Sequence, residues 1–171
     1  IDASQALVPG KNKIRITPSA GMKPMFQLTS TAYLPWGDAR QPTKQAFDIK
    51  VAYDRTTLAK DDIVGVRVEV RSNLPGKAEM GIVDVAVPPG FEVLAEDLER
   101  AVSDQTIQRF TLAGRQIILY VPAFVPDKPF VVTYRVRARF PVRAATGSAK
   151  AYEYYNPDNV GLAAPEAMKV D

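Results

Sequence analysis

The sequence predicts an all-β fold, an antiparallel β-sandwich with one amphipathic α-helix inserted between strands. Three observations lead to this fold class. Hydrophobic and polar residues alternate with a period of two over most of the chain, proline and glycine separate the alternating runs, and one segment has the period of a helix. A chain of 171 residues with 46% hydrophobic residues is long enough for one domain with its own core.

Three segments show the alternation expected of strands with one buried face. They are Phe47–Tyr53, Ile63–Arg71 and Phe130–Phe140, in which every second residue is apolar. In the last segment Phe140 belongs to the apolar set that we expect to face the core. Two further segments, Met80–Val87 and Arg115–Val121, are more continuously apolar, which is typical of strands covered on both sides.

Turn residues lie where these runs end, and the fourteen prolines concentrate there. This distribution favours many short strands over a helical bundle, because proline breaks helices and is confined to the edges and ends of strands. The predicted turns are Leu74–Lys77, Pro88–Gly90, Ala113–Gly114, Pro126–Pro129 and Asn156–Asp158.

One helix is predicted over Glu92–Val102. Leu94, Leu98 and Val102 recur every four residues and form its apolar stripe. Burial of each leucine would contribute about 1.5–3 kcal/mol, so packing against the sheets should decide whether the helix forms. Its polar side is predicted to consist of Glu96, Asp97, Glu99 and Arg100.

The first forty-five residues are predicted to form a separate part. Lys13–Ile16 and Met25–Leu34 can form strands, but prolines and glycines interrupt the segment, and a polar connector follows Trp36. We therefore expect N-terminal strands and a linker at 1–45, which could be the end of a preceding β-domain. The sandwich is expected at 46–171.

Composition excludes several classes of function. The chain has no histidine and no cysteine, which excludes Ser-His-Asp and Cys-His catalysis, His/Cys zinc sites and disulfides. The net charge of +3 arises from 22 basic and 19 acidic residues and does not indicate a nucleic-acid partner. No apolar run reaches the roughly 20 residues needed to span a bilayer. We predict no enzyme activity, no cofactor and no metal ion.

Five short motifs in a fixed order resemble the C-terminal receptor-binding domain of alpha-macroglobulins. Met80–Val85 is similar to a family strand with the pattern M-x-I-V-D-V, and Gly90–Phe91 resembles the entry to the family's helix. Ile118–Val121, Phe140–Arg143 and the closing Tyr152–Tyr155 follow in the same order as in the family. The resemblance covers roughly residues 46 to 165 and implies a macroglobulin-like or immunoglobulin-like sandwich.

The resemblance implies a non-catalytic interaction domain of a protease-trapping inhibitor, with roles in interdomain packing, conformational switching and partner recognition. Its partners would be other domains of the same polypeptide, including a thioester domain, and indirectly a target protease. Vertebrate relatives bind a receptor through two helix lysines, and the matching positions here are Ala95 and Glu99. The missing cysteines and glycosylation sequons favour a bacterial parent that is exported to the periplasm or the extracellular space.

The candidate interface residues lie on the helix and at the closing strand. Tyr152 and Tyr154 are predicted on one face of a strand and Tyr155 on the other, with a core or domain-packing role favoured over a ligand contact. The acidic residues of the helix are expected to form its polar face, and this interpretation is favoured over a cation site. The proposed interface consists of Glu96, Glu99, Arg100, Tyr152, Tyr154 and Tyr155.

Two alternatives to the protease-trapping function stay open. The chain could instead be a structural or adhesive cell-surface sandwich, or, less favoured, a carbohydrate-recognising accessory domain.

The role of one basic surface is also open. Arg135, Arg137 and Arg139 could form a basic stripe that binds an acidic partner. A solvated sheet face paired with Glu69 is preferred, because surface ion pairs of this kind are common.

Overall fold

A computed structural model describes the chain at residues 6–8, 10–15, 17, 19, 21, 25, 27, 29 and 45–171. The chain divides into two units, Ile1–Leu34 and Pro35–Asp171. In the first unit the Asn12 side chain accepts a hydrogen bond from the Val8 N–H and donates one to the Val8 carbonyl. Residues 13–15 of the predicted strand Lys13–Ile16 are not in a strand. The predictions for Met25–Leu34 and for the connector up to residue 44 fall almost wholly outside the described residues.

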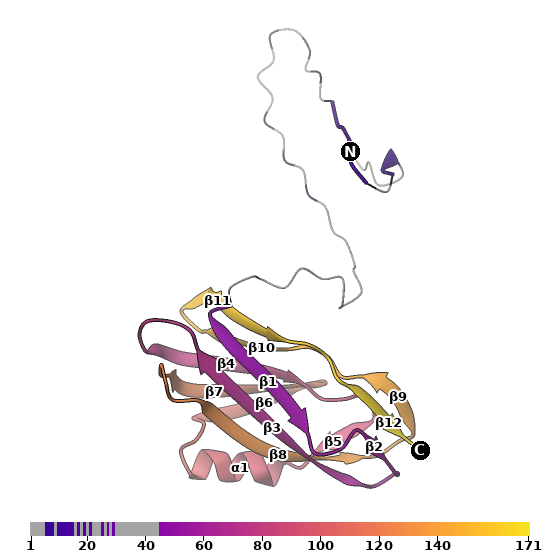
Figure 1. Cartoon of the computed structure of the whole chain (residues 1–171), viewed down its shortest axis with the longest axis vertical. Helices are drawn as coiled ribbons and strands as arrows, with labels where there is room; N and C mark the ends of the chain where they lie inside the picture. Colours follow the sequence, from indigo (N-terminus) through magenta and orange to yellow (C-terminus); the bar gives the residue numbers. More distant parts are fainter. Residues whose placement is uncertain are drawn as a thin grey trace. The chain divides into compact units, whose positions relative to one another are not determined.

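The second unit is a sandwich of two antiparallel sheets with a small third sheet at one end (Figure 1). The four-stranded sheet has the order β1 (Phe47–Tyr53), β3 (Ile63–Ser72), β8 (Phe130–Ala138) and β5 (Phe91–Val93). The five-stranded sheet has the order β11 (Asn156–Ala163), β10 (Ala149–Glu153), β4 (Ala78–Ala86), β7 (Gln116–Phe124) and β6 (Arg109–Ala113). The antiparallel β-sandwich expected from the sequence is confirmed.

The three-stranded sheet was not predicted. It contains β2 (Thr57–Leu58), β12 (Ala167–Val170) and β9 (Val142–Ala145), and β2 runs parallel to β12. Met168 and Val170 of β12 are buried, so the end of the described chain is part of the core. Two residues of β2 are too short a run for a period-two pattern to identify.

The core lies between the two large sheets and is filled by the alternate residues of their strands. Val64, Val66, Val68 and Val70 of β3 are all at most 2% exposed, as their alternation predicts. Phe124 of β7 packs against Phe47 of β1 with ring centroids 4.8 Å apart, so aromatic rings join the two layers.

The two open sides of the sandwich are closed differently. On one side β1 approaches β11, where the Ala46 N–H donates to the Val160 carbonyl at 3.2 Å and Gly161 lies directly against the Phe47 backbone. On the other side α1 (Ala95–Ser103) runs beside β8 and leads from β5 of one sheet to β6 of the other (Figure 1). Leu98 of α1 is completely buried, which confirms the predicted apolar stripe at this position.

The helix is shorter than the sequence predicts. Phe91–Val93 forms β5 and pairs with β8, and the Leu94 N–H continues this pairing by donating to the Arg135 carbonyl at 3.0 Å. The helix therefore begins at Ala95, and Leu94 is its half-buried N-cap residue. The four-residue spacing of Leu94 and Leu98 suits a helix, but backbone pairing with a neighbouring strand decides the first turn.

The prediction for the tyrosine-rich segment is wrong in two details. β10 ends at Glu153, which pairs with Asn156, so Tyr154 and Tyr155 form the loop of a hairpin instead of continuing the strand. Residues 156–158, predicted as a turn, begin β11. Pro157 is tolerated there because β11 is an edge strand, where a missing N–H interrupts no ladder.

Phe140 is the third difference. It lies two residues beyond the end of β8 and is 66% exposed, whereas the alternation predicts an inward side chain. The pairing between β3 and β8 ends at Arg137. Beyond this point no pairing with β3 keeps the side chains alternating between the two sides of the sheet, so Phe140 need not face inward.

Candidate interaction surfaces

The polar face of α1 contains three of the residues proposed from the sequence. Glu96, Glu99 and Arg100 are exposed on this helix, with the Glu96 side chain 58% and the Arg100 side chain 67% accessible. Ala95 and Glu99 occupy the positions that the resemblance assigns to two lysines, so this helix has one neutral and one acidic residue where the resemblance implies two basic ones.

Asp97 behaves differently from its neighbours on the helix. Its side chain is 9% exposed and accepts two hydrogen bonds from Arg135 of β8, at 2.7 Å from Nε and 2.9 Å from Nη2. These charge-assisted bonds hold the pKa of the Asp97 carboxyl below its usual range. The sequence places Asp97 on the solvent face with Glu96, and this is wrong because Arg135 covers it.

The prediction that the arginine stripe pairs with Glu69 is also wrong. Glu69 is bound by Arg67 at 3.2 Å and by Arg71 at 2.7 Å, both from its own strand. Arg135 binds Asp97, and Arg139 lies 3.6 Å from Glu92 of β5. Arg135 of β8 therefore attaches α1 to the four-stranded sheet, and Arg139, one residue beyond the end of β8, lies near the acidic side chain of β5.

A groove of about 940 Å³ lies beside α1 on the outer side of the four-stranded sheet. Small residues of three strands line it, namely Ala52, Gly65 and Thr133, together with Arg67 and Arg100. Across residues 6–29 and 45–171, as far as they are described, no group of three or more acidic, histidine or cysteine side chains is placed to hold a metal ion.

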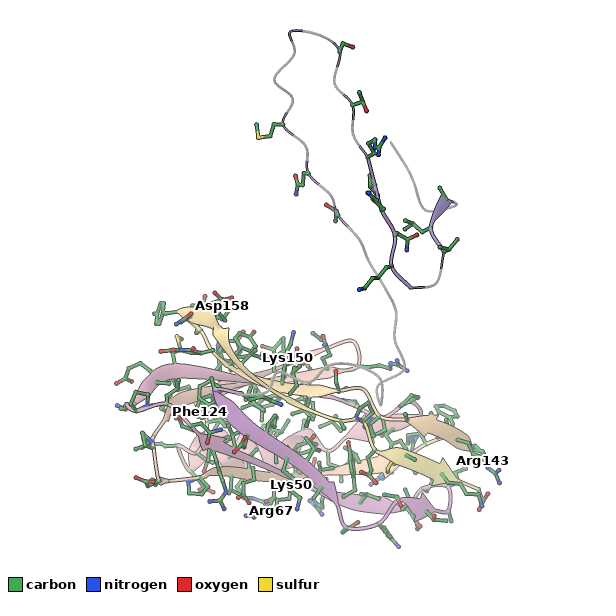
Figure 2. All side chains as sticks on the ribbon, turned by 45° about the horizontal axis from the view of Figure 1, so that its top comes forward. Lys50, Arg67, Phe124, Arg143, Lys150 and Asp158 are labelled. Atoms are coloured by element: carbon green, nitrogen blue, oxygen red, sulfur yellow. The ribbon has the colours of Figure 1, made fainter. Side chains whose placement is uncertain are left out.

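The hairpin loop of Tyr154 and Tyr155, which we call the tyrosine tip, is the most exposed aromatic feature of the described sandwich. The two side chains are 51% and 75% exposed, and their rings meet edge to face with centroids 5.2 Å apart. The Tyr154 N–H donates to the Met80 carbonyl at 2.9 Å, which anchors the loop to β4. The loop therefore presents two ordered aromatic rings, and Asp158 lies beside it (Figure 2).

Tyr152 lies within the sheet and is half-buried. It pairs with Ile82 of β4, which in turn pairs with Tyr120 of β7, so the three side chains form one row across the sheet. Burial raises the pKa of Tyr152, and the nearby Asp84 carboxylate adds to this effect. The guanidinium of Arg109 lies 3.8 Å from the centroid of the Tyr120 ring and extends the row to the sheet edge.

The six residues proposed from the sequence thus fall into two groups on opposite edges of the sandwich. Tyr152, Tyr154 and Tyr155 lie on and next to β10, near the β11 edge of the five-stranded sheet. Glu96, Glu99 and Arg100 lie on α1, which contacts β6 and β8 at the other edge. Their role in an interface stays a prediction.

Sequence reasoning missed Arg109, Tyr120 and Ile82 as members of one row on the outer side of the sheet. The apolar run Met80–Val87 predicts a strand covered on both sides, yet Ile82 and Asp84 alternate with the core residues Val83 and Val85. The alternation was therefore present but hidden, since an outward isoleucine reads as a core residue.

A family model described as the A-macroglobulin receptor binding domain matches residues 76–164, which is just over half of the 171 residues. The matched span begins before β4 and ends after β11. It therefore includes α1, the row of Tyr120, Ile82 and Tyr152, and the tyrosine tip.

Solved structures of bacterial alpha-2-macroglobulins share the fold. One is native alpha-2-macroglobulin from Escherichia coli, spanning domain MG7 to the C-terminus, with 17% identity and a TM-score of 0.65 over 77% of this chain and 24% of that chain. Another is the Salmonella protein reacted with methylamine, with 16% identity and a TM-score of 0.65 over 78% of this chain and 10% of that chain. The present chain thus spans a quarter or less of these structures.

Proposed function

Because the chain belongs to the family of the A-macroglobulin receptor binding domain, we propose that it is the non-catalytic interaction domain of an alpha-macroglobulin-like protease-trapping inhibitor. Its task in this proposal is to pack against other domains of the same polypeptide and to change that packing when the trap is triggered. The coverage of only 10–24% of the bacterial relatives fits a domain that acts within a larger protein.

The observation that carries this proposal is the tyrosine tip. Two adjacent aromatic side chains, each at least half exposed, are held in order by a hydrogen bond to β4 and by each other. Tyrosine supplies a large, stiff contact area at low entropic cost and is enriched in protein interfaces. A tip of this kind is suited to insertion into a pocket of a neighbouring domain.

The helix does not fit a lysine-reading receptor. Ala95 and Glu99 replace the two lysines, and Glu96 lies next to them in the first turn. A receptor that recognises a pair of cations would meet a carboxylate here. Partner recognition through α1, if the parent protein uses it, would therefore require a basic partner.

We further propose that the parent protein is exported, to the periplasm or to the extracellular space. The support is the likeness in fold to bacterial alpha-2-macroglobulins. The absence of cysteine is compatible with export, since a sandwich with a large buried core is stable without disulfides. No helix of the described residues is long and apolar enough to cross a membrane.

Protease capture by the intact polypeptide that, in this proposal, contains this chain tests the function. We expect the double variant Tyr154→Ala, Tyr155→Ala to alter capture or to trigger it without cleavage, because domain packing is lost. Phe140→Ala is the matched control, since Phe140 is also an exposed aromatic residue but lies away from the tip, two residues beyond the end of β8. Unchanged capture in the double variant, or an equal effect of the control, contradicts the proposal.

A further inference from the structure

The outer side of the five-stranded sheet can be assigned residue by residue. A Cβ atom at Gly81 would overlap the ring of Phe124, a core residue, so Gly81 faces inward and Ile82 faces outward. Asp84 faces the same way as Ile82, because the side chains of a strand alternate. The pairing of β4 with β7 and β10 then places Ile118, Tyr120 and Tyr152 on this outer side.

These side chains form a largely apolar surface, which we call the tyrosine face. Ile82 is 2% exposed although it lies outside the core cluster, so its outward neighbours must cover it. The pairing of β10 with β11 adds two more apolar side chains to the same side. The tyrosine face consists of Ile82, Ile118, Tyr120, Tyr152, Val160 and Leu162.

The outer side of the four-stranded sheet has a different character. Its strands carry Lys50, Arg67, Glu69, Arg71 and Arg135 on that side, each exposed or bound in an ion pair. Figure 2 shows Lys50 and Arg67 on one side of the sandwich and Lys150 on the other. The two faces of one sandwich therefore differ in polarity, which is expected when one faces water and the other a partner.

A cation without an acidic partner, Arg109, lies beside the tyrosine face. Within 45–171 no carboxylate forms a salt bridge with Arg109, which lies over Tyr120 at 3.8 Å. The second cation, Lys150, has its Nζ 3.9 Å from Asp84 Oδ2. This ion pair balances its own charge, so the net charge of the face is that of Arg109.

We propose that the tyrosine face is the docking surface for a second domain of the same parent polypeptide, one whose contacting side is flat, apolar and carries a carboxylate opposite Arg109. This inference rests on the proposed function and names the surface and the partner chemistry that the packing would use. The tyrosine tip lies at the end of the same sheet, where Tyr154 follows β10, so the tip and the face can contact one partner together.

The partner chemistry follows from what docking would bury. Isoleucine and tyrosine side chains gain from an apolar cover, whereas an unpaired guanidinium loses its water. Only an acceptor on the partner, and best a carboxylate, offsets that loss at Arg109. The Asp84–Lys150 pair brings its own counter-charge, so the partner needs no charged group at that place.

Site-specific photo-cross-linking in the intact parent polypeptide tests the inference. A benzoylphenylalanine replaces Thr111, which is exposed and pairs with Ile118 on the tyrosine face. The matched control replaces Thr133, an exposed threonine on the outer side of the four-stranded sheet. A third position, Tyr154, reports on the tip alone, and mass spectrometry identifies the peptides that are joined.

We expect an intramolecular cross-link from position 111 to another domain, at a peptide that contains Asp or Glu, and none from position 133. Arg109→Glu should reduce that cross-link about tenfold or more, and Arg67→Glu should leave it unchanged. Cross-links from Tyr154 alone overturn this inference and leave the proposed function standing. No cross-link from 111 and 154 contradicts both proposals, and a cross-link from 111 to a second copy, or equal yields from 111 and 133, overturns the docking surface.

Discussion

Arg135 of β8 donates two hydrogen bonds, 2.7 and 2.9 Å long, to the carboxylate of Asp97 in α1 and thereby attaches the helix to the four-stranded sheet. The guanidinium offers two parallel N–H groups that fit the two carboxylate oxygens. The buried Leu98 is the next residue in the helix, so the ion pair and the apolar contact act on the same turn. Asp97 therefore differs from the other acidic residues of α1, because its carboxylate binds Arg135 instead of facing the solvent.

Asp97→Asn should destabilise the chain by about 1–2 kcal/mol, which is less than a buried charged pair contributes because the Arg135 side chain is 46% exposed. Urea unfolding at pH 7 measures the change in free energy of unfolding. Glu99→Gln is the control on the same helix, and an exposed substitution of this kind should change stability by no more than about 0.5 kcal/mol. Equal effects of the two variants would show that the pair with Arg135 stabilises nothing.

The contribution of Asp97 should also depend on pH. Its pKa is lowered in the folded state by the hydrogen bonds from Arg135, so the stabilisation is present above the unfolded pKa of about 3.9 and is lost as the pH falls through the folded pKa. The stability gap between the unmodified chain and Asp97→Asn should therefore be constant near neutral pH and close below about pH 4. A gap that widens in acid would contradict this assignment.

Asp84 should behave with the opposite sign. Burial raises its pKa above the unfolded value despite the nearby Lys150, so the ionised carboxylate costs stability at neutral pH, and the cost disappears as the pH falls below the unfolded pKa. We expect Asp84→Asn to raise the midpoint of urea unfolding at pH 7 and to lose this advantage in acid. A lowered midpoint at pH 7 would mean that the Lys150 pair outweighs the burial.

Gly161→Ala should be strongly destabilising. An added Cβ would overlap the carbonyl oxygen and carbon of Phe47, and both belong to the backbone of β1, which cannot move without opening the closed side of the sandwich. The cost should be about 1–3 kcal/mol or more. Gly76→Ala is the matched control, because a Cβ there meets no atom within 4 Å. Thermal unfolding should separate the two, and similar melting temperatures would show that β1 and β11 do not approach this closely.

Leu98→Ala should cost about 2–5 kcal/mol, the usual range for removing a fully buried leucine. Leu94→Ala should cost less, since Leu94 is half-buried and precedes the helix. Denaturant titration of both variants measures the difference. If the two costs were equal, the helix would begin earlier than Ala95 and the original four-residue stripe would be the better description.

The sequence was most informative where one physical requirement acted alone. β3 and β8 were predicted because their alternate residues are apolar over long runs, and a half-buried strand needs nothing else to be recognised. It was less informative where two requirements competed. Glu92 and Val93 belong to the predicted helix but pair with β8 as a strand, and Tyr154 fits both a strand and a loop, so the choice depends on neighbours distant in the chain.

The sequence by itself determined the fold class, the alternating core residues of β3 and β8, and the absence of histidine and cysteine chemistry. Only the tertiary structure decided that Asp97 is covered by Arg135, that Tyr154 and Tyr155 form an exposed tip, and that Ile82 lies on an outer apolar face. The physical reason is that hydrophobic periodicity depends on adjacent residues in the chain, whereas burial and pairing on a surface depend on which strands and helices become neighbours.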